Sequence, residues 1–408
     1  MLNPGQAQRQ YLLVTANYWG FTLTDGALRM LVVLYFYQLG YAPLAIALLF
    51  VFYELFGVVT NLLGGWLGSR IGLNRTMNMG LALQVAALLM LSVPEGWLSV
   101  PYVMAAQALS GIAKDLNKMS AKSSVKQLVG SQQQAGLYRW IALLTGSKNT
   151  LKGVGFFLGG ALLTGMGFRV AVLLMAAALL MMLLISWRYL RPGLGRTEQK
   201  VKFRDIFSTS RAVNVLSAAR LFLFGARDVW FVIAVPVFLS AQLGWSHQQV
   251  GSFLALWIIG YGGVQVVAPW ITGKRSGRVP DGRSAVFWAA LLALLPALLA
   301  WQLDRHLEVG WLIVAGLALF GILFAINSSL HSYLIVSYAR EEAVSLDVGF
   351  YYMANALGRL LGTLLSGWLF QEHGLASCLW VSTGLVLLAA LLSLGLPRHK
   401  PVATGVLR

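Results

Sequence analysis

Twelve long apolar segments follow one another along the chain, and they constrain its fold more than any other feature. Each approaches or exceeds the length of about 20 residues at which an α-helix crosses the hydrocarbon of a bilayer. We place them near residues 11–38, 43–68, 76–96, 98–121, 138–165, 167–188, 211–240, 246–272, 284–303, 310–338, 345–370 and 374–396. Charged residues make up only 11% of the chain, against roughly 25% in soluble domains. The sequence therefore predicts an all-α polytopic membrane protein and excludes cytosolic enzymes, secreted modules and disordered chains.

Alternate connections between these segments are rich in Lys and Arg. They hold Arg70 and Arg75; Lys122, Lys126 and Arg139; the seven basic residues of 188–211; Lys274, Arg275, Arg278 and Arg283; Arg340; and the C-terminal Arg398, Lys400 and Arg408. By the positive-inside rule, both termini and the basic middle loop face the cytoplasm. We expect a bacterial inner membrane protein. Topology then explains much of the net charge of +17, and the dispersed basic residues exclude a nucleic-acid partner.

The second six segments repeat features of the first six. Residues 38–41, Gln-Leu-Gly-Tyr, recur as Gln-Leu-Gly-Trp at 242–245, and Gly111-Ile112 with Asn117 recurs as Gly321-Ile322 with Asn327. Chance similarity among apolar helices is the alternative explanation. A true repeat gives a six-helix half over 1–190, a basic cytoplasmic linker over 191–210 and a second six-helix half over 211–408. Two such halves with substrate held between them are the organisation of major facilitator transporters.

Two glycine-rich motifs agree with that fold. Residues 65–72, Gly-Trp-Leu-Gly-Ser-Arg-Ile-Gly, resemble the signature between spans 2 and 3 of the superfamily, with Ser69 in place of its aspartate. Gly146, Gly155, Gly159 and Gly160 match the spacing of the antiporter signature in span 5, with Phe156 in place of its proline. Small residues at these intervals also allow helix backbones to pack closely, so packing explains them equally well.

Ionisable residues inside the predicted spans indicate the function. The cations are Arg29, Lys114, Lys118, Lys148, Lys152, Arg220, Arg227 and Arg359, and the acids are Asp25, Glu54, Asp115 and Asp228. One charge at a helix centre costs roughly 2.5–3.5 kcal/mol on insertion scales, so these side chains must face partners or a water-filled space. Eight cations against four acids leave an excess of four. Because Arg and Lys bind phosphate-like groups strongly, the excess predicts a small anionic substrate and disfavours lipophilic cations.

Several of these residues have other interpretations. Asp25 and Arg29 are four residues apart, so they could form an ion pair within one helix. Glu54 could carry a coupled proton or simply pair with a cation. His331 could also carry a proton, although a hydrogen-bonded packing role is the simpler interpretation. We expect Lys122 and Lys126 to be interfacial anchors, and we include Asn117 and Asn327 among the residues that could orient a ligand.

The chain lacks the sequence motifs of the enzymes and pumps that we considered. It contains no G-x-x-x-x-G-K-[ST] phosphate loop, no H-E-x-x-H and no G-x-S-x-G. Its single cysteine, Cys378, excludes an internal disulfide and a cysteine-based metal site. We therefore expect a monomeric secondary transporter without enzymatic activity, cofactor or metal, driven by a gradient of substrate or coupling ion.

Longer strings resemble the ArsJ-type organoarsenical efflux permeases, a branch of the major facilitator superfamily associated with arsenate resistance. The similar segments are residues 11–19, 23–30, 110–122, 144–149, 223–231 and 254–257, among them Leu-Thr-Asp-Gly-Ala-Leu-Arg-Met, Ser-Gly-Ile-Ala-Lys-Asp-Leu-Asn-Lys-Met and Leu-Phe-Gly-Ala-Arg-Asp-Val-Trp-Phe. The likeness extends over nearly the whole chain and is weakest in the middle loop and the C-terminal tail.

The resemblance implies export of 1-arseno-3-phosphoglycerate, with glyceraldehyde-3-phosphate dehydrogenase as the functional partner that makes this ester from arsenate. Outside the cell the labile ester would decompose to arsenate and phosphoglycerate. The charge argument reaches only as far as a small polyanion. Two alternatives remain: an organophosphate–phosphate antiporter, which would use arginines on spans 1 and 7 in much the same way, and a membrane enzyme or anion channel.

Overall fold

The computed structural model describes residues 4–41, 49–129, 134–191, 193–194, 210–273, 280–305 and 310–398. The described residues form helices and turns and contain no strand. The helices are α1 (Pro4–Gln38), α3 (Val51–Ile71), α4 (Leu73–Leu91), α5 (Val100–Val129), α6 (Gln134–Tyr189), α7 (Arg211–Phe231), α8 (Ala234–Ala241), α9 (His247–Gly273), α10 (Gly282–Asp304), α11 (Gly310–Tyr338) and α12 (Val344–Ser393), with short 3-10 helices at Glu95–Trp97 and Glu341–Ala343. Most of the predicted linker 191–210, and Lys274, Arg275, Arg278, Lys400 and Arg408, lie outside the described residues.

Two of these helices each contain two spans. α6 has 56 residues, or about 84 Å of helix, far more than the roughly 30 Å of bilayer hydrocarbon. Its helical backbone is interrupted at Gly167, where φ is 74°. Gln10 of α1 donates a hydrogen bond to the carbonyl of Tyr189, and Tyr11 donates one to the carbonyl of Trp140. Both ends of α6 therefore lie beside the start of α1, so the chain reverses at Gly167.

α12 is divided in the same way at Gly374, which also has a φ of 74°. Together with α7 and α8, which form one interrupted span, the described helices make up the twelve predicted spans in two six-helix halves. Length and hydropathy alone select seven spanning segments, two of which are the double-length α6 and α12. α1, α4 and α5 fall outside this selection; α1 and α5 carry the charges described above, and α4 begins with the polar residues Asn74 and Arg75.

The backbone supports the internal repeat. Gly40 and Gly244, the glycines of the repeated Gln-Leu-Gly strings, have φ values of 83° and 69°. Gly167 and Gly374, which separate the last two spans of each half, share a φ of 74°. Glycine tolerates this left-handed region because it has no Cβ. Equivalent turns in both halves therefore use the same residue for the same backbone reason.

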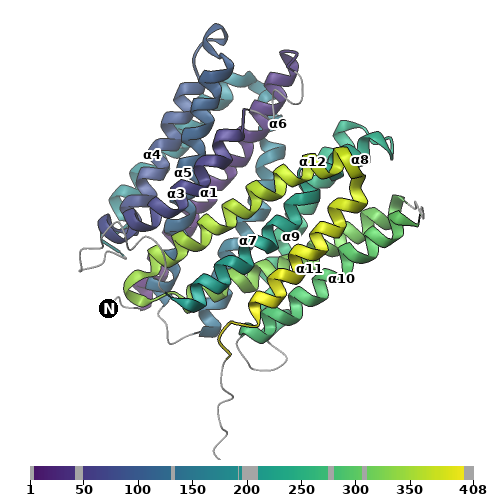
Figure 1. The fold of residues 1–408 in the computed structure, drawn as a ribbon. Coiled ribbons are helices and arrows are strands. Elements are labelled where there is room, and N and C mark those ends of the chain that lie inside the picture. Colours follow the sequence, from purple (N-terminus) through teal and green to yellow (C-terminus); the bar gives the residue numbers. More distant parts are fainter. Residues whose placement is uncertain are drawn as a thin grey trace, which may run out of the picture.

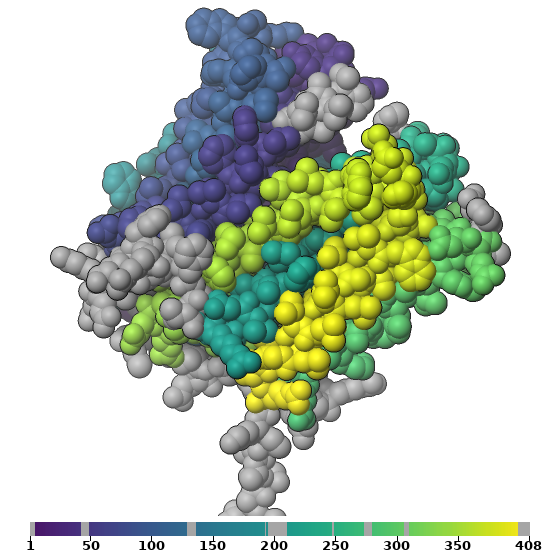
Figure 2. Space-filling model, in the orientation of Figure 1, coloured from purple at the N-terminus to yellow at the C-terminus, as the bar shows by residue number. Residues whose placement is uncertain are grey.

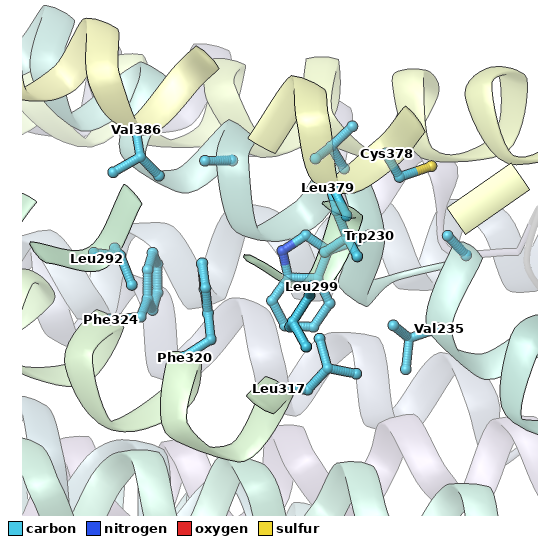
Figure 3. Packing of buried hydrophobic residues seen from close by; sticks show 14 of the residues in the cluster. Trp230, Val235, Leu292, Leu299, Leu317, Phe320, Phe324, Cys378, Leu379 and Val386 are labelled. Atoms are coloured by element: carbon cyan, nitrogen blue, oxygen red, sulfur yellow. The ribbon is translucent and has the colours of Figure 1, made fainter. Parts of the chain in front are cut away.

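Buried apolar residues form three clusters. One draws only on residues 223–390 and is built around Trp230, Phe320 and Phe324 (Figure 3). A second draws only on residues 21–179. The third combines both halves, with Tyr11, Tyr138 and Tyr333 among its members. The third cluster lies where α1 begins, α11 ends and the chain reaches Leu396, and we call this the chain-end side. Figure 1 shows the two groups of helices, purple to blue and teal to yellow.

Glycines bring the two halves together on the chain-end side. A Cβ built on Gly65 of α3 would lie 2.6 Å from the carbonyl oxygen of Ser345, and one on Gly146 of α6 would lie 2.5 Å from that of Gly262. The contact of α3 with the yellow-green first part of α12 is visible on the surface (Figure 2). Gly155 and Gly159 instead pack α6 on α1. Close helix packing therefore accounts for these glycines of both motifs.

Candidate functional site

Six of the eight predicted cations contact an acid near the middle of the bundle, where α1, α3, α5, α6, α7 and α12 meet. These six are Arg29, Lys114, Lys118, Lys152, Arg227 and Arg359. The four acids are shared among them, so the excess of four positive charges remains. Among these predicted residues, each half holds two of the four excess positive charges. The first half contributes five cations and three acids, and the second half contributes three cations and one acid.

Glu54, in the first turn of α3, is surrounded by three cations from three other helices. Its Oε1 lies 3.0 Å from Nη2 of Arg359 and 3.7 Å from Nη1 of Arg29, and its Oε2 lies 3.8 Å from Nζ of Lys114. Arg359 belongs to the second half, so Glu54 joins the two halves. We call Arg29, Glu54, Lys114 and Arg359 the Glu54 cluster.

Asp25 does not pair with Arg29, so the interpretation as an ion pair within one helix is wrong. The Tyr53 hydroxyl donates a hydrogen bond of 2.6 Å to Oδ1 of Asp25, and Nζ of Lys152 lies 3.9 Å from its Oδ2. The Tyr53 ring also lies 3.8 Å from the Lys114 ammonium and 5.5 Å from the Arg29 guanidinium. Tyr53 therefore positions an acid and two cations by hydrogen bonding and cation–π attraction.

Asp115 and Asp228 are anchored within their own halves. Asp115 accepts a hydrogen bond from Lys118 and lies 3.7 Å from the Lys114 ammonium. Asp228 accepts hydrogen bonds from Nε of Arg227, at 2.6 Å, and Nε of Arg359, at 3.1 Å. Both side chains are almost completely buried. These two acids hold cations in place and leave little carboxylate surface for a ligand or solvent.

Lys148 and Arg220 contact no carboxylate among the described residues. Lys148 donates a hydrogen bond to Asn149, whose amide in turn bonds to Gln265 of α9. Arg220 donates through Nε to Asn355, at 2.8 Å, and its guanidinium lies 3.7 Å from the centre of the Phe224 ring.

Lys122 is linked to both Lys148 and Arg220 through α11. Its ammonium donates to Ser332, one turn from the Ser328 hydroxyl that Arg220 contacts, and the carbonyl of Gln265, whose side chain accepts from Asn149, accepts from Ser329. We call Lys122, Lys148 and Arg220 the acid-free cluster. It lies nearer the chain-end side than the Glu54 cluster, because Lys122 follows Lys114 by two turns of α5.

Three predicted residues do not join these clusters. Asn327 donates hydrogen bonds to the carbonyls of Trp288 and Leu323, within the second half. Asn117 is buried where α4 packs on α5, without a hydrogen-bond partner among the described residues. His331 is fully buried, and neither ring nitrogen has a partner there, so the hydrogen bond expected of a packing histidine is missing. We leave these three residues out of the site.

The expectation that Lys122 and Lys126 are interfacial anchors is wrong, because both side chains are buried between the halves. The Lys122 ammonium donates to the Ser332 hydroxyl at 3.2 Å, and the Lys126 ammonium donates to the carbonyl oxygens of Ala339 and Ser337. Both lysines contact the last part of α11. The four-residue spacing of the lysines on α5 was visible in the sequence, but their partner helix was not.

Sequence reasoning also missed the neutral partners Tyr53, Asn149, Gln265 and Asn355. Each is a polar or amphipathic side chain within an apolar segment, and two of them directly follow or precede a predicted site residue. That adjacency was the available signal. It is weak, because neighbours in a helix point in different directions.

Comparisons with known proteins agree with this architecture. The sequence matches the family model described as Major Facilitator Superfamily over residues 12–301 and 216–406. No curated protein matches the chain by sequence. The structure is similar to the human organic anion transporter MFSD10 (TETRAN), with a TM-score of 0.72, 18% identity, and coverage of 96% of this chain and 100% of that one.

Two other solved structures are similarly close. The proton:xylose symporter XylE has a TM-score of 0.73 at 13% identity, with 96% of this chain and 95% of that one covered. A bacterial homologue of the iron transporter ferroportin in an outward-facing state has a TM-score of 0.74 at 14% identity, with coverage of 94% and 98%. At these identities the likeness supports the fold alone.

Proposed function

This chain belongs to the Major Facilitator Superfamily and is a membrane transporter of the secondary type, and we propose that it carries a small organic polyanion with an anionic group at each end. The observation that carries the proposal is that both halves have an excess of positive charge at the site: two charges in the second half, and three in the first when the buried Lys122 is counted with the predicted residues. A ligand with a dianionic group at each end would offset most of this excess in both halves at once. Such bridging favours the rocking of one half against the other around a fixed site.

We assign one anionic group to the acid-free cluster and the other to the Glu54 cluster. Nη2 of Arg220 donates no hydrogen bond to a described residue, and in the described part of the chain the Lys148 ammonium bonds only to a neutral amide. These two groups, one from each half, retain donors for phosphate-like oxygens. Arg29, Lys114 and Arg359 would contact the other end. Lys118, Lys152 and Arg227 add positive field from positions fixed by buried acids.

1-Arseno-3-phosphoglycerate has the required form, with phosphate at one end and arsenate at the other. Its identity rests on the sequence resemblance to organoarsenical permeases, and the two arguments are independent. With cytoplasmic termini, as the positive-inside rule indicates, the structure is closed on the cytoplasmic side. Export would then require this side to open and admit the ester formed by glyceraldehyde-3-phosphate dehydrogenase.

The specific substrate is tested by arsenate tolerance of bacterial cells that express the chain, the dehydrogenase, both or neither. We expect tolerance only with both proteins. Arg227→Gln should abolish it, because it replaces a guanidinium beside the site by a neutral amide and so removes one positive charge. Arg169→Gln, at an exposed position of α6, is the matched control. Tolerance that needs no dehydrogenase, or that survives Arg227→Gln at equal expression, would contradict the assignment.

Counterflow distinguishes the runner-up, an organophosphate–phosphate antiporter. Vesicles loaded with inorganic phosphate should take up labelled glycerol 3-phosphate rapidly if the chain is such an exchanger. For a carrier of two-headed anions, we expect glycerol 1,3-bisphosphate to compete for transport and glycerol 3-phosphate to compete at least about tenfold less well, because it leaves one cluster without an anion and so loses charged hydrogen bonds.

A further inference from the structure

Glu54 differs from the other three acids of the site in its exposure. Its side chain is 26% exposed, against 6% for Asp25, 2% for Asp115 and 1% for Asp228. The side chains of Arg29 and Arg359, which flank it, are each 30% exposed. These three groups therefore border the accessible space between the halves. Among the ion-paired side chains of the site these three are the most exposed, so a ligand in this space can contact them.

Glu54 also differs in how it is held. Asp25 is fixed by the Tyr53 hydroxyl, Asp115 by Lys118 and Asp228 by Arg227, each from the same half. The hydrogen bond of Glu54 among the described residues comes from Arg359, in the opposite half. Its contacts with Arg29 and Lys114 are longer, at 3.7 and 3.8 Å. No hydrogen bond from a described residue of its own half fixes the carboxylate, so it can move when Arg359 takes another anion.

Glu54 occupies the position that the proposed function assigns to an anionic group of the ligand. One carboxylate contacts cations of α1, α5 and α12, which is the set that the proposed function assigns to one end of the substrate. The hydrogen bonds and close glycine contacts between the halves among the described residues lie at this level or nearer the chain-end side. Glu54 is thus bound as a tethered anion between the halves.

We propose that Glu54 is a built-in substitute for the substrate, which occupies part of the anion site in the empty transporter and lets it change conformation without cargo. This inference rests on the proposed function. When the halves close over the site, water leaves the cations, and an unpaired cation out of water is strongly unfavourable. The two-headed ligand removes this penalty in the loaded transporter. Glu54, shared by three cations, reduces it in the empty one.

The consequence is a specific change in transport mode. Net transport requires the empty protein to return, whereas exchange requires only the loaded form to cross. Replacing Glu54 by glutamine removes the tethered charge and leaves the cations without it. Exchange should then continue while net transport falls. The ligand should also bind more tightly, because it no longer competes with a resident carboxylate.

The experiment uses purified full-length protein in lipid vesicles, with labelled glycerol 1,3-bisphosphate as the probe. Exchange is measured as uptake into vesicles that contain the same unlabelled compound, and net transport as uptake into vesicles without it. For Glu54→Gln we expect the ratio of net transport to exchange to fall by about tenfold or more and the Kd of the probe to decrease. Glu372→Gln, on the exposed surface of α12, should behave as the unmodified protein.

Two outcomes overturn the inference: a net-to-exchange ratio for Glu54→Gln equal to that of the unmodified protein, or loss of both modes in a variant that melts normally. If the glutamine variant does not fold, Glu54→Asp tests the same point. It keeps the charge but withdraws it from Arg359 by one methylene, so the ratio should again fall, and an unchanged ratio overturns the inference. Failure of the proposed function looks different, because the unmodified protein would then transport the probe in neither mode.

Discussion

At the scale of single residues, the environment of Arg220 requires a planar guanidinium. Nε donates to Asn355 and Nη1 lies 3.3 Å from the Ser328 hydroxyl, while the guanidinium lies over the Phe224 ring and 5.2 Å from the centre of the Tyr351 ring. A lysine ammonium is a compact point charge and cannot stack and donate in several directions at once. The charge alone is therefore not sufficient at this position.

We predict that Arg220→Lys lowers transport of glycerol 1,3-bisphosphate at least about tenfold while the protein stays folded. Uptake into vesicles and the melting temperature check this. Arg70→Lys is a matched control, because Arg70 also lies over an aromatic ring, 5.0 Å from the centre of that of Trp66, but on the exposed end of α3. Equal transport by Arg220→Lys and the unmodified protein would show that only the charge is needed.

The sequence identified the charged members of the site except Lys122, which it assigned to the interface, but not how they pair. Spacing placed Asp25 and Arg29 on one face of a helix, which is correct for their helix in isolation. It could not show that Tyr53 of α3 and Lys152 of α6 approach Asp25 more closely. Pairing depends on how each helix is rotated against its neighbours. That rotation is set by the packing of many apolar side chains, and charge spacing does not report it.

At the scale of helices, α6 and α9 approach each other through glycine backbone. A Cβ built on Gly262 would lie 2.5 Å from the amide nitrogen of Thr150 and 2.6 Å from the carbonyl oxygen of Gly146, whereas one on the adjacent Gly263 would meet nothing within 4 Å. Gly262→Ala must therefore push the helices apart, at a typical cost of about 1–3 kcal/mol. Gly263→Ala only exchanges a poor helix former for a good one, worth about 1 kcal/mol in its favour.

The two alanine variants should consequently differ in sign. We predict that Gly262→Ala lowers the midpoint of thermal unfolding in detergent and that Gly263→Ala leaves it unchanged or raises it. Intrinsic fluorescence during heating provides the measurement. If both variants lower the midpoint equally, the close approach of α6 and α9 is not what limits substitution at Gly262.

Helix boundaries were largely predictable, because the apolar segments end at glycine, proline and charged residues. Gly40 and Gly244 stood out as members of a repeated string, and their shared backbone conformation supports that interpretation. Gly167 and Gly374 also form turns with positive φ, although the sequences around them are not similar. The predicted spans already end near these turns, but only the backbone angles show that the two glycines adopt the same conformation, since a turn requires one permissive residue and leaves the flanking side chains free to differ.

At the scale of the whole molecule, the two sides of the bundle are built differently. Each half has an apolar core of its own, and the third cluster joins the halves only on the chain-end side. There the Lys126 ammonium donates to the carbonyl oxygens of Ala339 and Ser337, at the end of α11. A cation at a helix C-terminus is favourable because the last carbonyl groups have no partner within the helix. Lys126 therefore stabilises the closed chain-end side across the interface between the halves.

Removing this cation should open the chain-end side more often. A hydrogen bond to a charged group contributes about 1.5–3 kcal/mol, and each 1.4 kcal/mol changes a population ratio about tenfold. We predict that Lys126→Met raises the reaction rate of a cysteine at Ser345, which is 3% exposed beside Gly65, by about ten- to a hundredfold, because labelling follows the open population when reclosing is fast. The native Cys378 is buried, so it should react little with the label.

Lys126→Arg is the control, because it keeps the charge and should leave the rate nearly unchanged. Equal labelling of Ser345→Cys with methionine, arginine or lysine at 126 would mean that apolar packing alone holds this side closed, and that the lysines on α5 are needed only for the ligand.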